Sequence, residues 1–149
     1  MKNRYTLAEI LRLHTVAELK QMAKGYGLKG YSKLKKEEVI ELIAPAFLEE
    51  EEMHLKFLVA TKEEIEDFER ALSEQIVVEP DTYKYYYWQT LGYAFINNQY
   101  EVQIPQEIED LYYKVKNTKQ YQITRMRTSL IHEYALACTS LYAVMELLR

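Results

Sequence analysis

Residues 13–44 read LHTVAELKQMAKGYGLKGYSKLKKEEVIELIA, and this stretch predicts two helices joined by a short link. Thr15 and Glu18 have the spacing of a capping box, in which each side chain accepts a hydrogen bond from the backbone N–H of the other residue. The helix that opens there is expected to end at Gly25, where a left-handed conformation costs little. Its apolar stripe consists of Val16, Leu19, Met22 and Ala23.

The link that follows carries two further glycines, Gly27 and Gly30, which suit the irregular dihedrals of an extended connection. A second helix is expected from about Leu34 and should stop near Pro45, because proline cannot continue a helix. The apolar face of this helix consists of Val39, Ile40, Leu42 and Ile43. The pattern therefore indicates a helix–extension–helix module.

Basic residues are concentrated on the link and on both of these helices. The candidate nucleic-acid-binding residues are Lys20, Lys24, Lys29, Tyr31, Lys33, Lys35 and Lys36. A helix N-terminus presents unpaired N–H groups and a partial positive charge, and lysines beside it strengthen the attraction for phosphate. Such contacts hold the backbone of DNA or RNA weakly and carry little sequence information. Two alternatives stay open because Glu37, Glu38 and Glu41 interleave with the lysines: a protein partner, or a packing role only.

The same stretch resembles the N-terminal domain of the transcription terminator Rho, and it is similar to the wider SAP and LEM-like modules. The resemblance rests on residues 13–20 and 27–40, which include both helices and the link. It implies two short, roughly parallel helices joined by an extended segment. The implied ligand differs between the relatives, since many SAP members bind DNA, the Rho-type module assists RNA handling and LEM members bind proteins.

Charge divides the chain into two parts, and the break falls at Glu49–Glu52. Residues 1–48 carry nine Lys and Arg against five Glu, whereas residues 49–149 carry ten Lys and Arg against eighteen Asp and Glu. We therefore expect two domains, a basic module over 1–48 and an acidic, mainly helical domain over 49–149. The acidic domain is interpreted as a scaffold or a protein-contact domain, because its charge would repel a duplex. The contact expected is with a protein partner or, by self-association, with a second copy of the chain.

The fold class expected is mainly α with one small β-hairpin. In the acidic part, a capping box at Thr61 and Glu64 opens a helix, and residues 76–78 favour a short strand. Asp81 is placed to cap a helix over 82–90, although the tyrosine-rich residues there also alternate well enough for a strand. Residues 92–104 are typical of a hairpin that turns at Asn97 and Asn98. A further helix is expected from Pro105, and a long helix with a wide apolar face is expected over 123–148. The order of these elements is that of a winged-helix-like domain.

The aromatic residues of the acidic part have two interpretations, a buried core or a protein interface. The possible protein interface consists of Tyr85, Trp88 and Tyr142. Cys138 lies on the apolar stripe of the last helix and is expected to be a small core residue. Since the sequence stops inside an apolar pattern, we expect either that this helix ends against a partner or that the chain belongs to something longer.

No catalytic residue, metal site or cofactor is expected. His132-Glu133 begins like a zinc-binding HExxH helix, but Leu136 stands where the second histidine is required. A single cysteine suits a reducing cytoplasm, and no run of residues reaches the length of a membrane span. The sequence therefore predicts a non-catalytic, cytoplasmic protein that associates with DNA or RNA, with a role in transcription regulation. The alternative is a protein–protein interaction adaptor without direct nucleic-acid contact.

Overall fold

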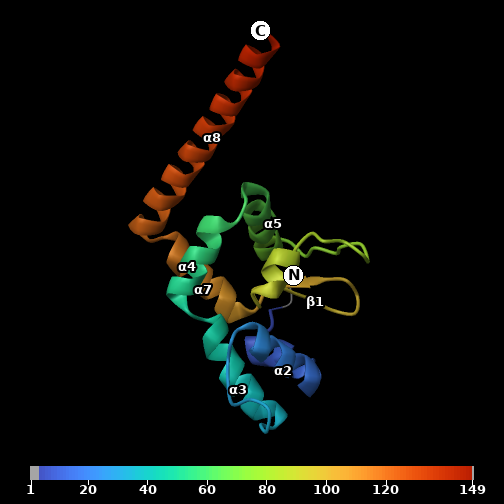
Figure 1. Ribbon diagram of the computed structural model, residues 1–149. Helices are drawn as coiled ribbons and strands as arrows, with labels where there is room; N and C mark the ends of the chain where they lie inside the picture. Colours follow the sequence, from blue (N-terminus) through green and yellow to red (C-terminus); the bar gives the residue numbers. More distant parts are fainter. Residues whose placement is uncertain (1–3, 149) are drawn as a thin grey trace.

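The computed structural model describes residues 4–148, and this part of the chain is mainly helical with one two-stranded antiparallel sheet (Figure 1). The predicted fold class is therefore confirmed. The elements are α1 (Leu7–Arg12), α2 (Val16–Gly25), α3 (Lys36–Phe47), α4 (Glu50–Val59), α5 (Lys62–Ser73), α6 (Tyr86–Thr90), β1 (Phe95–Ile96), β2 (Val102–Gln103), α7 (Gln106–Lys116) and α8 (Lys119–Leu147).

Threonine side chains define where several helices begin. The two predicted capping boxes are confirmed, because Thr15 accepts from the N–H of Glu18 at 3.2 Å and Thr61 accepts from that of Glu64 at 3.2 Å. A third box at Thr6 opens α1, a helix that the sequence interpretation did not include. Each box satisfies two backbone donors that a helix start otherwise leaves unpaired.

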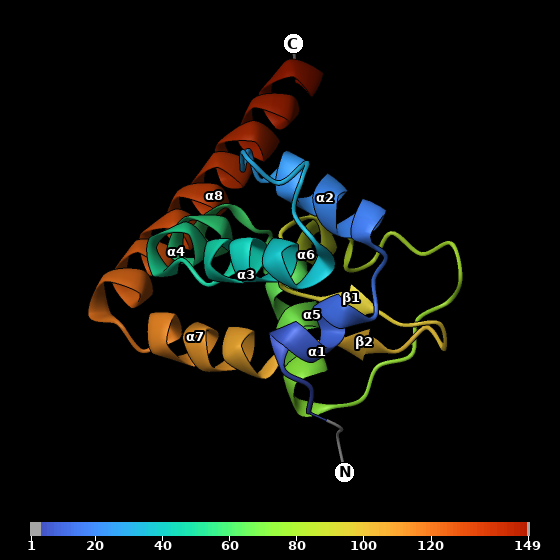
Figure 2. The ribbon, with the colours of Figure 1, turned by 90° about the horizontal axis from the view of Figure 1, so that it is seen from below.

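The N-terminal module consists of three helices rather than the two expected. α3 packs against both α2 and α1, and the main chain of α1 is tied to α7 by the Leu7 N–H, which donates to the Glu107 carboxylate at 2.8 Å (Figure 2). The predicted apolar stripes are largely buried, with Leu19, Val39 and Ile43 fully inaccessible to solvent. The module therefore packs onto the rest of the chain as well as onto itself.

Two details of the module differ from the prediction. α2 does end at Gly25, but the left-handed residue is Gly27, with φ of 72°, and Gly30 has φ of 80°. α3 continues two residues beyond Pro45, because Phe47 at its end is buried to 2% exposure and holds the last turn in place. Within residues 4–48, positive φ therefore occurs only in the link between the helices, at Gly27 and Gly30.

The hydrophobic core is continuous between the module and the remaining helices. Its centre is a cluster of aromatic rings from four elements and a loop, formed by Phe57, Phe68, Trp88, Tyr93 and Tyr112. The module joins this core through Phe47, and through Tyr26, whose hydroxyl donates to the Leu91 carbonyl. Folding of the two parts is therefore coupled by shared apolar burial.

The segment between α5 and α7 is the part where the sequence prediction was least accurate. Residues 76–78 form an isolated bridge, Val77 to Glu101, instead of a strand. The helix expected over 82–90 is only α6, and Asp81 does not cap it. Tyr85 precedes α6 in the left-handed region with φ of 64°, because its buried ring is anchored by a 2.9 Å hydrogen bond from its hydroxyl to the Asp67 carbonyl.

The predicted hairpin is confirmed, but its turn is longer than expected. β1 and β2 pair in the register Phe95 with Gln103 and Ile96 with Val102. The side-chain oxygen of Asn97 accepts from the N–H groups of Gln99 and Glu101, which closes a loop rather than a two-residue turn. Positive φ falls on Tyr100 and not on the two asparagines. Element order agrees with a winged-helix-like domain, and that likeness stays a prediction.

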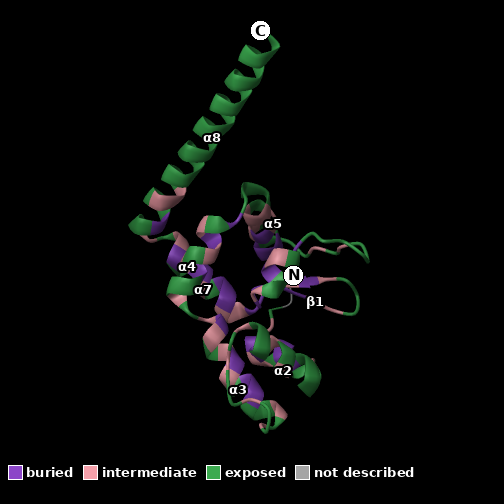
Figure 3. Cartoon of the chain, in the orientation of Figure 1, coloured by how far each residue is buried: buried purple, intermediate pink, exposed green. Residues whose placement is uncertain are grey.

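α8 leaves the body of the molecule after its second turn and extends away from it (Figures 1 and 3). Tyr121 is the buried residue of this helix, and the Arg125 guanidinium donates to the Ala60 carbonyl at 3.2 Å. From Met126 to Leu148 every residue is exposed, so Cys138 is a surface residue and the prediction that it packs in the core was wrong. Among residues 4–148, no helix combines the length and the apolar run that a membrane span requires.

Glu69 makes the stability of the body sensitive to acid. Burial raises the pKa of this carboxyl, but hydrogen bonds from Lys116 and from the Tyr112 hydroxyl outweigh burial and hold the pKa below its ordinary value of 4.5. A carboxyl of this kind stabilises the fold above pH 4.5, and the contribution is lost as pH falls through the lowered pKa. Between pH 7 and about pH 3, the urea midpoint of the wild type should therefore fall further than that of Glu69→Gln. Glu66→Gln, which alters only an exposed pair with Lys62 at 3.9 Å, should fall as the wild type does; equal falls in all three proteins would contradict the assignment.

Candidate nucleic-acid interface

The predicted lysines follow one another along the chain from α2, through the link, to the start of α3. Lys20 and Lys24 lie one turn apart on α2, Lys29 and Lys33 lie in the link, and Lys35 is the N-cap residue of α3. Because α2 and α3 pack against each other, the link and the start of α3 lie close to α2 (Figure 2). The structure thus keeps these residues within one module.

Two of the predicted lysines have structural partners. The Lys20 ammonium donates to the Ser32 carbonyl at 2.8 Å and holds the link against α2. The Lys36 ammonium donates to the Arg12 carbonyl at 2.6 Å and holds the end of α1 against α3. Both contacts use main-chain oxygens, so neither contact pairs an ammonium group with a carboxylate. Their main effect is to fix the geometry of the module.

Four lysines extend from the module into solvent, and we call Lys24, Lys29, Lys33 and Lys35 the free lysines. All four are exposed, and in the described part of the chain none of them is paired with a carboxylate. The nearby acid Glu37 is instead engaged by Arg12, whose Nε lies 3.1 Å from its Oε1. The positive charge of the free lysines is therefore available to an anion.

The N-terminus of α3 adds backbone donors beside Lys35. Its N-cap residue is Lys35, and no side chain caps the first turn, in contrast to the threonine caps of α1 and α2. Uncapped N–H groups and the helix dipole favour an anion at this end. Glu38 stands in the same turn and is exposed, which lowers the local positive potential. The surface therefore suits weak rather than tight binding of phosphates.

Tyr31 is less available than expected. It is half-buried and packs against the hydrophobic core beside the link. Its ring therefore supports the conformation of the link first, and only the exposed part can contact a base. Less of the ring is therefore exposed for stacking than the sequence interpretation assumed.

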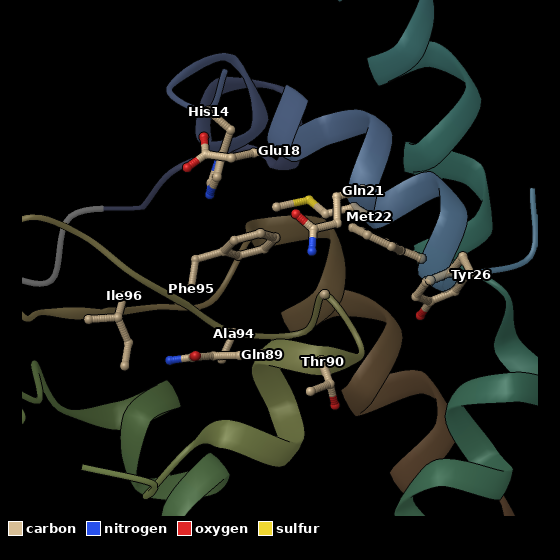
Figure 4. Close-up of a pocket in the computed structure, with 13 residues that line it drawn as sticks. His14, Glu18, Gln21, Met22, Tyr26, Gln89, Thr90, Ala94, Phe95 and Ile96 are labelled. Atoms are coloured by element: carbon tan, nitrogen blue, oxygen red, sulfur yellow. The ribbon is translucent and has the colours of Figure 1, made fainter. Parts of the chain in front are cut away.

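A groove of about 630 Å³ lies between α2 and the segment from α6 to β1 (Figure 4). Met22 and Phe95 form its apolar wall, and the amides of Gln21 and Gln89 come from opposite sides. The only acid that lines it is Glu18, whose pKa is lowered by hydrogen bonds from the backbone and side chain of Thr15. Sequence reasoning did not find this groove, because its walls come from segments about 70 residues apart in the chain. It carries no lysine and does not extend the basic surface.

The predicted protein interface is placed differently by the structure. Tyr85 and Trp88 are buried to 4% and 1% exposure, so neither is available at the surface. Burial raises the pKa of Tyr85 to about 12, and the indole N–H of Trp88 donates to the Glu64 carbonyl at 2.9 Å. Only Tyr142, on α8, is exposed. The correction has a physical reason, since the aromatic core of this small body needs both rings.

Residues 4–148 contain no group of three His, Cys, Asp or Glu side chains placed to hold a metal ion. His14 stays close to the main chain, with Nδ1 at 3.0 Å from the Ile10 carbonyl and its ring edge against Phe95. His54 packs its ring against Tyr121. Both rings contribute to packing between elements.

Comparison with known proteins identifies the module. Residues 11–52 match the family model described as Rho termination factor, N-terminal domain. This range begins in α1, contains α2, the link and α3, and ends in the first turn of α4. No curated protein and no solved structure matches the chain. Residues 11–52 are therefore a Rho termination factor N-terminal domain, a nucleic-acid-associated module that carries all the predicted lysines.

Proposed function

We propose that this chain is a non-catalytic nucleic-acid-associated protein that binds the backbone of DNA or RNA through its N-terminal module. The observation that supports the proposal is the set of four free lysines, which have no carboxylate partner in residues 4–148 and lie within the range matched by the Rho family model. The acidic remainder, residues 49–149, serves as a scaffold and keeps nucleic acid on the basic side. The proposal also places the protein in the cytoplasm and gives it a role in transcription regulation. An exposed thiol such as Cys138 suits that reducing compartment.

The mode of binding follows from the groups that the module offers. Ammonium groups and helix N–H donors contact phosphate oxygens, which are the same at every position of a nucleic acid. With about four phosphate contacts, log K should fall with log salt at a slope of roughly −3 to −4. Binding should therefore be weak at physiological salt and nearly independent of sequence.

The decisive experiment removes charge from the free lysines without loosening the module. Lys33→Glu/Lys35→Glu changes two lysines whose ammonium groups have no ion pair within residues 4–148. Lys36 is avoided because it holds the Arg12 carbonyl. The matched control is Lys62→Glu/Lys119→Glu, which makes the same change in net charge at the first residues of α5 and α8, outside the module. Thermal melts of both variants establish that the fold is kept.

We expect the module variant to bind single-stranded RNA, single-stranded DNA and duplex DNA at least about tenfold more weakly than the wild type at low salt, measured by fluorescence anisotropy. Its salt slope should be smaller in magnitude by about 2. The control variant should lose much less affinity and keep the slope. If both variants lose affinity equally, net charge rather than the free lysines governs binding, and wild-type affinity in the module variant would exclude these residues as the site.

An adaptor that recognises proteins, with no direct nucleic-acid contact, is the second candidate. It is favoured by the apolar residues that α8 exposes, among them Leu141 at 64% and Tyr142 at 66% exposure. A partner of this kind should remain bound in a pull-down after nuclease treatment and in high salt. Nucleic acid bound through phosphates would be released under the same conditions.

A further inference from the structure

The outer part of α8 exposes more apolar surface than any other element among the described residues. From Met126 to Leu148 no residue is buried, and Ile131, Leu141 and Leu147 are 70%, 64% and 85% exposed (Figure 3). In proteins most of the stability of a helix comes from packing of its apolar face against other elements, and apolar patches of this extent mark interaction sites. We therefore expect another molecule to pack against the exposed apolar side chains of this part of α8.

A heptad repeat of mostly apolar residues runs along α8, although apolar residues such as Leu136 and Tyr142 occupy other positions. Taking Arg127 as position a, the a positions are Arg127, Tyr134, Leu141 and Leu148, and the d positions are Ile123, Leu130, Ala137 and Val144. Seven of these eight residues are apolar, over nearly four heptads. Ile131, Cys138 and Met145 occupy the e positions and widen the same stripe. This pattern is typical of a helix that packs along a second helix.

The stripe is accessible along the whole length of the repeat. Tyr121 and Arg125, which attach α8 to the body, occupy positions b and f of the same repeat. These positions lie on the side of the helix away from the a and d residues. The body therefore packs against one side of α8 and leaves the a/d stripe open, down to Ile123 at 44% exposure.

Charge indicates a partner of the same kind as α8 itself. Residues 134–145 contain no Asp, Glu, Lys or Arg, so the stripe has nothing with which to attract an acidic or basic surface. For the same reason, two copies of the stripe meet without repulsion between like charges. The stripe has about ten apolar side chains, and at roughly 80 Å² each they would bury about 800 Å² per helix. This is the area that each partner buries in a standard interface.

We propose that α8 forms an antiparallel two-helix coiled coil with α8 of a second copy of this chain. In an antiparallel pair, a residues face d residues. When the midpoints of the two repeats coincide, Leu130 lies opposite Leu141 and Ile123 lies opposite Leu148. The same alignment places the large ring of Tyr134 opposite the small Ala137. The remaining layer places Arg127 opposite Val144, so the one charged residue of the stripe does not face its own copy. The apolar layers pair side chains whose volumes can fill the space between the helices.

A parallel pair packs less well. It would place Arg127 against Arg127 and bury two like charges side by side. It would also place Ala137 against Ala137 and leave a gap next to a layer of two tyrosines. The antiparallel pair separates the two bodies, and with them the two basic modules, by roughly 35 Å along the coiled coil. Self-association does not depend on nucleic-acid binding, so the two proposals can fail separately.

The first experiment measures molar mass by sedimentation equilibrium of the full chain between about 1 and 100 µM. The wild type should have twice the mass of the monomer. Leu141→Asp, at an a position, should weaken association by about a hundredfold or more, because it buries a carboxylate in the interface. Leu136→Asp is the matched control, since Leu136 is 56% exposed and occupies position c, on the opposite side of the helix. It should remain a dimer, and circular dichroism establishes that both variants keep the folded body.

The second experiment determines orientation by cross-linking in a Cys138→Ser background. Leu130→Cys and Leu141→Cys proteins are treated with a short bis-maleimide, separately and as a mixture. In the antiparallel pair only the mixture should cross-link, because two residues 130 lie roughly 16 Å apart along the axis. Cross-linking of each protein with itself would show a parallel pair.

Four outcomes overturn the proposal: a monomer at 100 µM, an oligomer larger than two, a parallel pair, or a dimer that Leu141→Asp leaves intact. Co-sedimentation of a monomeric wild type with phosphatidylcholine or phosphatidylserine vesicles would assign the stripe to a lipid surface instead.

Discussion

Replacing Trp88 with alanine is expected to destabilise the protein by about 3–5 kcal/mol, the usual cost of removing a large aromatic side chain from a core. Trp88 is 1% exposed, and its ring lies 4.5 Å from that of Phe57 and 4.8 Å from that of Phe68, centroid to centroid. The variant would leave a cavity at the centre of the aromatic cluster and lose the hydrogen bond from the indole N–H to the Glu64 carbonyl. Equilibrium urea unfolding measures the loss.

Tyr86→Ala is the matched control for this prediction. Tyr86 belongs to the same short helix, α6, but is 61% exposed. Its removal should change the free energy of unfolding by no more than about 0.5 kcal/mol. A small effect of Trp88→Ala, comparable to that of Tyr86→Ala, would contradict the buried position of the indole and return Trp88 to the surface role that the sequence suggested.

Gly92→Ala is expected to destabilise the protein by about 2–4 kcal/mol, because two costs add at one position. Gly92 has φ of 73°, a conformation that residues with a Cβ adopt only with strain. A Cβ placed there would overlap the ring of Phe47, which is buried between the module and the body. The variant therefore tests the packing of the N-terminal module against the rest of the chain.

Gly25→Ala provides the comparison at a glycine without these constraints. Nothing lies within 4 Å of the position where its Cβ would be, and it is the last residue of α2. Alanine there should be neutral or stabilising by up to about 1 kcal/mol, since it restricts the unfolded chain. If Gly92→Ala were as well tolerated as Gly25→Ala, the contact between Phe47 and Gly92 would be wrong.

Prediction from the sequence succeeded where structure is determined by neighbours in the chain. Thr15 with Glu18 and Thr61 with Glu64 act over three residues, so the helix starts that they define were correct. The hairpin and the start of α7 after Pro105 were likewise found from alternation and from a proline that suits a helix start.

Prediction failed where distant segments override local preference. Tyr85 adopts positive φ because its ring is buried and hydrogen-bonded to Asp67 in α5, and no local pattern contains that information. The apolar stripe on α8 was predicted correctly as a stripe but wrongly as buried at Cys138. Periodicity gives the face of a helix, whereas only the path of the chain decides what lies against it.

The candidate site shows the same division. The sequence by itself determined the helix–extension–helix module and the concentration of lysines on it, because capping, helical periodicity and charge are local properties of residues 13–44. Only the tertiary structure decided that Lys20 and Lys36 hold main-chain carbonyls while Lys33 and Lys35 stay free, since those carbonyls belong to other segments. It also decided that Trp88 is core and α8 is surface, because burial depends on which segments the whole chain brings together.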